Sequence, residues 1–129
     1  MEVEDNHGFR FREWNIYQDA LKFRRAIAIL LKTYPPSEKY ALTDQTKRAL
    51  NSIVLNIAEG ANKTTDREVK VYINRAHCSL DEVVACTDCA FDDGYVTGEQ
   101  RELILQDGAS LAKRLRGFVT HLGSLVHES

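Results

Sequence analysis

The sequence predicts an all-α protein, an antiparallel four-helix bundle whose helices run up, down, up and down. Three observations predict it: long stretches with apolar residues at helical spacing, three short breaks between them, and no convincing β-strand pattern. Short connections place consecutive helices antiparallel, and 129 residues suffice for one domain with one core. We therefore expect a flexible N-terminal arm over residues 1–12 and the bundle over residues 13–126.

The first two helices are expected over residues 13–34 and 42–60. The core face of the first recurs at steps of three and four: Ile16, Ala20, Phe23, Ile27, Leu30 and Tyr34. Pro35 ends this helix, because the residue before a proline is disfavoured in helical conformation. In the second helix, Thr43 is the expected N-cap and Gly60 the expected terminating glycine.

The third and fourth helices are expected over residues 66–91 and 98–126. Each follows a candidate capping box, Thr65 with Glu68 and Thr97 with Gln100. The expected inner face of the third helix comprises Val69, Tyr72, Ile73, Ala76, Leu80, Val83, Thr87 and Ala90. That of the fourth comprises Ile104, Gly108, Leu111, Leu115, Phe118, Leu122 and Leu125. The small residues Gly108 and Gly117 suit close approach of another helix.

The second helix also carries a stripe of polar residues along one face. The members of this polar stripe are Gln45, Arg48, Ser52, Asn56 and Glu59, at steps of three and four. Buried polar groups are costly unless they are paired. Three interpretations stay open: a network within the bundle or between subunits that fixes register, a contact with a ligand or RNA, and a catalytic acid–base pair. For the last, the sequence offers no identifiable nucleophile or cleft.

Three basic runs are candidates for phosphate recognition. The candidate nucleic-acid-binding residues are Lys113, Arg114 and Arg116 in the fourth helix and Lys63, Arg67 and Lys70 around the start of the third. A third run, Lys22, Arg24 and Arg25, lies in the first helix. Alternatively, these basic residues form solvent-exposed helix faces that bind no phosphate. The net charge of −2 argues against a strongly basic nucleic-acid binder but does not address local patches.

The cysteines do not predict a metal site. Cys86 and Cys89 form a CxxC in the interior of a helix, with Cys78 and its neighbour His77 upstream, but a structural zinc site needs a second pair of ligands. We expect small, buried, helix-packing cysteines and no cofactor. An odd cysteine count, no signal peptide and no membrane-spanning stretch predict reduced thiols and a cytoplasmic protein. With no nucleophile–base pair or metal set, we expect no enzymatic activity.

From Tyr34 onward the chain carries a set of recognisable motifs: Tyr34-Pro35-Pro36-Ser37-Glu38-Lys39-Tyr40-Ala41-Leu42, Gln45, Arg48-Ala49, Ser52-Ile53 and Asn56-Ile57-Ala58-Glu59-Gly60, then Ala76, Ser79-Leu80, Glu82 and Gly94-Tyr95-Val96. With these motifs the chain resembles the bacterial four-helix-bundle family, also called the 23S ribosomal RNA intervening-sequence proteins. The resemblance covers about residues 13–125. Two positions depart from the family pattern: Val54 stands where a proline is common, which predicts a less kinked helix, and Cys78 where a glycine is common, so that the thiol would fill a close helix contact.

The resemblance implies a four-helix bundle that assembles into a ring, expected to be a homopentamer. Some family members are encoded within insertions in 23S ribosomal RNA genes. A related group, the accessory variability proteins of diversity-generating retroelements, forms pentameric barrels that bind nucleic acid and a reverse transcriptase. By this analogy the expected partners are other copies of the chain and either RNA or a nucleic-acid-processing protein, with no membrane partner. The alternative is a purely structural assembly or protein–protein interaction module.

Overall fold

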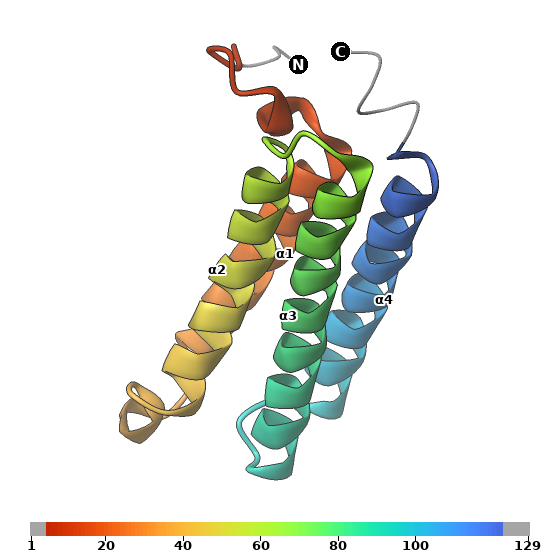
Figure 1. Cartoon of the computed structure of the whole chain (residues 1–129). Helices are drawn as coiled ribbons and strands as arrows, with labels where there is room; N and C mark the ends of the chain where they lie inside the picture. The colour runs from red at the N-terminus through yellow and green to blue at the C-terminus, as the bar shows by residue number, and fades with distance from the viewer. Residues whose placement is uncertain (1–4, 123–129) are drawn as a thin grey trace.

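A computed structural model describes residues 5–122 of the chain, and it confirms the all-α four-helix fold. The helices are α1 (Asn15–Leu31), α2 (Leu42–Gly60), α3 (Asp66–Asp92) and α4 (Gly98–Thr120), and they lie side by side in Figure 1. Two short 3₁₀ helices, η1 (Arg10–Glu13) and η2 (Pro36–Glu38), precede α1 and α2. Residues 5–122 contain no β-strand.

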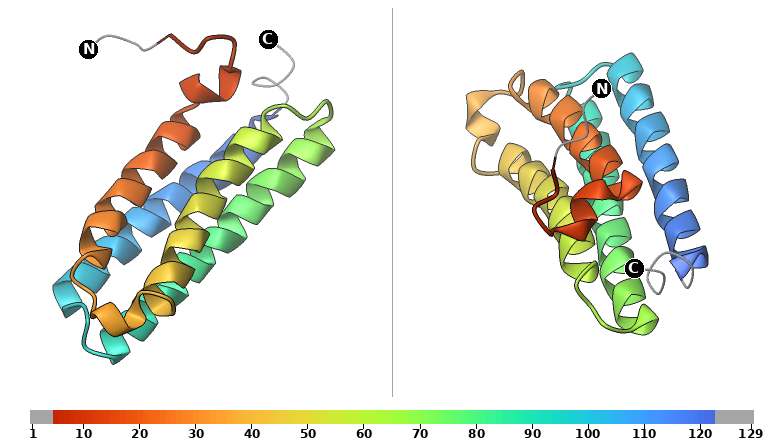
Figure 2. Two further views of the ribbon diagram at one scale, coloured as in Figure 1. Left: turned by 90° about the vertical axis from the view of Figure 1, so that its left-hand side faces the viewer. Right: turned by 90° about the horizontal axis from the view of Figure 1, so that it is seen from above.

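Each helix packs against the helices next to it in the sequence, and α4 returns to α1. The α2–α3 pair packs most extensively, followed by α3–α4, α1–α2 and α1–α4. This order places α1 across the bundle from α3. One end of the bundle carries η1, the α2–α3 turn and the end of α4, whereas the other carries η2 and the α3–α4 turn (Figure 2).

The predicted core faces are largely confirmed. The fully buried side chains include Leu50, Ile53, Ile57, Val69, Ile73, Leu80, Val83, Leu115 and Leu122. α1 ends three residues earlier than predicted, at Leu31, yet Tyr34 remains buried beyond it. Tyr72 is an exception on α3, because it is half-buried and outside the core. Leu125 lies outside the described residues.

The prediction of Thr43 as an N-cap is wrong. Thr43 lies inside α2, which begins at Leu42. The first free N–H is satisfied from outside the helix, since the Leu42 amide donates to Glu38 Oε2 at 3.0 Å. A carboxylate beside a helix N-terminus is also favoured by the helix dipole. Glu38 therefore performs the task that the sequence assigned to Thr43.

Gly60 is the last residue of α2, but it is not required for a left-handed turn. The capping residue is Ala61, in right-handed helical conformation, and Gly60 does not have a positive φ. A Cβ at position 60 would instead lie 2.9 Å from Tyr72 Cβ on α3. Glycine is therefore needed here because α2 and α3 approach closely.

The capping predictions for α3 and α4 are confirmed to different degrees. At Thr97 both bonds of the box form, with Gln100 N–H donating to the Thr97 hydroxyl at 3.0 Å and Thr97 N–H donating to Gln100 Oε1 at 2.8 Å. At Thr65 the hydroxyl accepts from Glu68 N–H at 3.2 Å, while the Glu68 carboxylate accepts from the hydroxyl instead of the backbone. Both threonines nevertheless cap their helices.

The two glycines of α4 differ in their surroundings. A Cβ at Gly108 would lie 3.5 Å from Val84 Cγ2 on α3, so this glycine does sit at a helix contact. A Cβ at Gly117 would have no described neighbour within 4 Å. The prediction of close approach is therefore wrong for Gly117.

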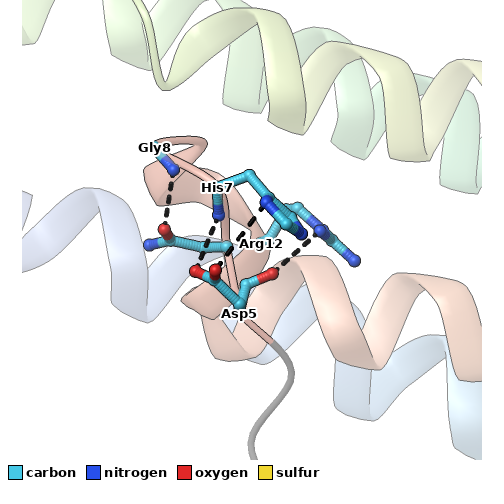
Figure 3. A network of polar contacts seen from close by, with 5 residues as sticks. Asp5, His7, Gly8 and Arg12 are labelled. Carbon is cyan, nitrogen blue, oxygen red and sulfur yellow. Dashed lines mark hydrogen bonds and ion pairs between the residues drawn. The ribbon is translucent and has the colours of Figure 1, made fainter.

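The described part of the N-terminal arm forms a small polar cluster (Figure 3). The His7 amide donates to Asp5 Oδ1 at 3.0 Å, and Arg12 Nη1 donates to the Asp5 carbonyl at 3.1 Å. Arg10 then reaches the bundle, because its Nη2 donates to the Ala61 carbonyl at the end of α2 at 2.8 Å. The flexibility of the whole arm stays a prediction.

Candidate nucleic-acid interface

The polar stripe runs along the edge of α2 that faces α3, and only its centre is half-buried. Ser52 Oγ lies 2.7 Å from Ser79 Oγ on α3, and Asn56 Nδ2 donates to both the carbonyl (2.8 Å) and the hydroxyl (3.0 Å) of Ser52. Ser79 also donates to the Arg75 carbonyl at 3.1 Å. These bonds join α2 to α3 and satisfy the half-buried members of the stripe.

The other three members of the stripe, Gln45, Arg48 and Glu59, are exposed. The Arg48 side chain is 79% exposed, and its Nε pairs with Asp44 one turn earlier on α2 at 3.0 Å. The five residues therefore do not form one buried network within the chain. Leu55 lies on the same outer face and is 61% exposed.

The structure divides the basic run of α4 between two neighbouring helices. Arg114 pairs with Asp19 on α1, whose side chain is only 20% exposed. Arg116 points toward the opposite edge of α4 and donates from Nη1 to His77 Nε2 on α3 at 3.3 Å. Lys113 is exposed on the outer surface of α4. Arg114 thus joins α1 to α4, and it does not share a surface with Arg116.

Arg116 instead lies on the same side of the bundle as Lys70, a member of the second basic run. Both line an open groove of about 270 Å³ between α3 and α4, together with Ile73, Asn74, His77, Leu115 and Val119. We call it the α3–α4 groove. Its floor is apolar, and its rim carries two cations, an amide and an imidazole. His77 lies between two partners, because its Nε2 is 3.3 Å from Arg116 Nη1 and its Nδ1 is 3.8 Å from Asp81 Oδ2.

The remaining basic residues extend this surface over the outside of α3. Arg67 is exposed one turn before Lys70, at the spacing that places two residues on one helix face. Lys63, in the α2–α3 turn, and Arg75 both lie over the ring of Tyr72, each 4.7 Å from its centroid. We call this surface the basic band; its members are Lys63, Arg67, Lys70, Arg75, Lys113 and Arg116.

Sequence analysis did not single out Asn74, Arg75, or the pairing of His77 with Arg116. One signal was available, because Arg67, Lys70, Asn74 and His77 follow one another at steps of three, four and three. The approach of Arg116 from α4 depends on the helix pairing and is not visible in such a pattern.

The cysteines are free thiols in different environments. Cys86 is buried, and burial, the largest of several influences, raises the pKa of its thiol. Cys78 and Cys89 are exposed, so the prediction of buried packing cysteines is wrong for these two, and Cys78 fills no close helix contact. α2 continues without a break through Val54.

Two further findings concern the described residues. They contain no cluster of three or more His, Cys, Asp or Glu side chains that could hold a metal ion. None of the helices within residues 5–122 is sufficiently long and apolar to span a bilayer.

The fold defines a class: small all-α proteins built as a four-helix bundle, here with cationic side chains on α3 and α4. Within that class, the chain belongs to the family of 23S rRNA-intervening sequence proteins, whose family model matches residues 12–117. A similar solved structure is a protein of unknown function from the S23 ribosomal protein family of Bacteroides thetaiotaomicron. It is 24% identical, with a TM-score of 0.74, over 81% of this chain and 95% of that chain. No curated protein matches the sequence.

Proposed function

We propose that this protein is a non-enzymatic RNA-binding accessory of the cytoplasm that contacts RNA through the basic band. The observation that carries the proposal is that Lys70 and Arg116, from two different helices, line the same α3–α4 groove. Two cations that border one groove can neutralise phosphates of a single RNA strand. Membership of a family named for 23S rRNA supports RNA as the nucleic acid.

The slightly acidic net charge is compatible with this proposal. Affinity for phosphates depends on local potential, and the cations of the basic band gather around the first half of α3. Asp81, which faces His77, lies at one edge of the band. The charge of −2 describes the whole chain, whereas RNA would meet one face.

The test is a titration of RNA binding at low and near-physiological salt with the double variant Lys70→Glu/Arg116→Glu. Loss of two phosphate contacts should reduce the slope of log affinity against log salt by about 1.4 for single-stranded RNA. The matched control is Lys22→Glu/Arg25→Glu, which makes the same charge change at exposed positions on α1, across the bundle. Equal losses of affinity in the two variants would contradict an interface on the basic band.

A second candidate function is structural assembly, and it is favoured by the outer face of α2. Leu55 is an exposed apolar residue between the exposed Arg48 and Glu59. Such a face suits a contact between copies of the chain, which the family resemblance expects to be a pentameric ring. We propose that Leu55→Asp lowers the mass measured by light scattering, while Lys47→Asp on another face of α2 leaves it unchanged. A wild-type chain that is monomeric at high concentration would refute this assembly.

A further inference from the structure

Tyr72 is held at the α2–α3 edge with two cations over its ring. Lys63 Nζ and Arg75 Cζ each lie 4.7 Å from the ring centroid. The base of the side chain is fixed, because Tyr72 Cβ packs against Gly60 of α2. The ring itself is half-buried and does not belong to the hydrophobic core. The core therefore does not account for an aromatic residue here.

An aromatic ring bordered by cations is suited to bind an unpaired nucleotide. The faces of the bases stack on aromatic side chains with little regard to sequence, and adjacent cations pair with the phosphates on either side. The cations over Tyr72 belong to long, flexible side chains, so an incoming base can replace one of them on the ring. The displaced cation then remains within reach of the backbone phosphate of that nucleotide.

We propose that Tyr72 is a stacking platform for an unpaired base of RNA, with Lys63 and Arg75 binding its flanking phosphates. This inference rests on the proposed RNA-binding function and specifies its ligand as a single-stranded segment. The bases of a duplex are stacked on one another and do not offer a free face to Tyr72. In this arrangement the sugar-phosphate backbone of the RNA would continue from Tyr72 over the outside of α3 toward Arg67 and Lys70.

Tyr40 provides an internal control. It also lies near a cation, with Lys39 Nζ 5.3 Å from its ring centroid, and it is 86% exposed. It follows η2 at the opposite end of the bundle, however, away from the basic band (Figure 1). An adjacent lysine is thus common to the two tyrosines, whereas a position beside the basic band is particular to Tyr72.

The experiment uses the full chain and a short single-stranded RNA that carries one 2-aminopurine, a fluorescent base whose emission changes on stacking. A blunt RNA duplex is the comparison ligand. Tyr72→Leu should weaken binding of the single strand roughly 5- to 150-fold and abolish the fluorescence change, with little effect on duplex binding. Tyr72→Phe should retain both the affinity and the signal, and Tyr40→Leu should behave as wild type.

The outcomes distinguish the two proposals. Wild-type affinity in Tyr72→Leu, combined with weak binding by Lys70→Glu/Arg116→Glu, overturns the stacking site and leaves the RNA-binding function standing. Absence of RNA binding by the wild type at low salt overturns both. If circular dichroism shows that Tyr72→Leu is unfolded, Lys63→Gln/Arg75→Gln replaces it. That variant should lose single-strand affinity selectively, and equal affinity for the single strand would again overturn the site.

Discussion

Replacing Gly60 with alanine tests how closely α2 and α3 approach. The added Cβ would lie 2.9 Å from Tyr72 Cβ, whereas carbon atoms in good contact are about 3.5–4.0 Å apart. Tyr72 Cβ is attached directly to the backbone of α3, so it cannot move away by rotation of a side chain. Relief requires a shift between the two most extensively packed helices of the bundle.

The magnitude follows from two opposed effects. Overpacking in a well-packed site costs about 1–3 kcal/mol. Alanine is a better helix former than glycine by up to about 1 kcal/mol, and the gain is smaller at the last residue of a helix. We therefore expect Gly60→Ala to lower the free energy of unfolding by about 1–2 kcal/mol. For a chain of this size, Tm should fall by roughly 3–8 °C.

The matched control is Gly117→Ala on α4, where the new methyl group would have no described neighbour within 4 Å. Only the helix-propensity effect applies there, so this variant should gain about 0.5–1 kcal/mol. Urea unfolding followed by circular dichroism measures both at one protein concentration. If Gly60→Ala is as stable as the wild type while Gly117→Ala is stabilised, the argument from close approach is refuted.

Three further predictions concern a contact between helices, a helix cap and a contact between loops, and all are measured by urea unfolding. Arg114→Gln should cost about 1 kcal/mol, because it leaves the largely buried Asp19 carboxylate without its cation; no loss would show that water replaces it. Thr97→Ala should also cost about 1 kcal/mol, and an unchanged midpoint would show that the cap of α4 is dispensable. The hydrogen bond to Glu38, aided by burial, raises the pKa of Tyr95 above its ordinary value of 10.0. The neutral Tyr95 hydroxyl therefore stabilises the folded state below about pH 10, and this contribution is lost as the pH rises through the raised pKa. The stability advantage of wild type over Tyr95→Phe should therefore disappear at strongly alkaline pH, and an advantage that persists there would refute this linkage.

The fold could be predicted because its information is local. Apolar spacing defined the four helices, and Thr97 marked the start of α4 by its own hydrogen-bonding properties. The bounds of α2 were predicted correctly at residues 42 and 60, but the residue that caps its start was not. Thr43 has the right side chain for a cap, but its task is performed by Glu38, which extends forward from the preceding 3₁₀ helix to the Leu42 amide.

The candidate interface could be predicted only in part. Lys113, Arg114 and Arg116 are neighbours in the sequence, yet a helix turns by about 100° per residue and directs Arg114 and Arg116 toward different neighbouring helices. Lys70 and Arg116 are distant in the sequence and line one groove because α3 and α4 pack side by side in an antiparallel arrangement. Which residues of two helices share one surface depends on how the helices are aligned lengthwise, and apolar spacing does not specify that alignment.

Glu38 has a consequence for how the two halves of the molecule are aligned lengthwise. One carboxylate oxygen accepts from Leu42 N–H at 3.0 Å, and the other accepts from the Tyr95 hydroxyl at 3.0 Å. The α1–α2 hairpin is thereby pinned to the α3–α4 hairpin at a single depth. Apolar seams alone tolerate sliding by a helical turn, about 5.4 Å, since similar side chains then face one another again. If one hairpin slid by a turn along the other, Glu38 and Tyr95 would be separated and their hydrogen bond would be lost. This one side chain therefore favours the native lengthwise alignment over alignments shifted by one turn.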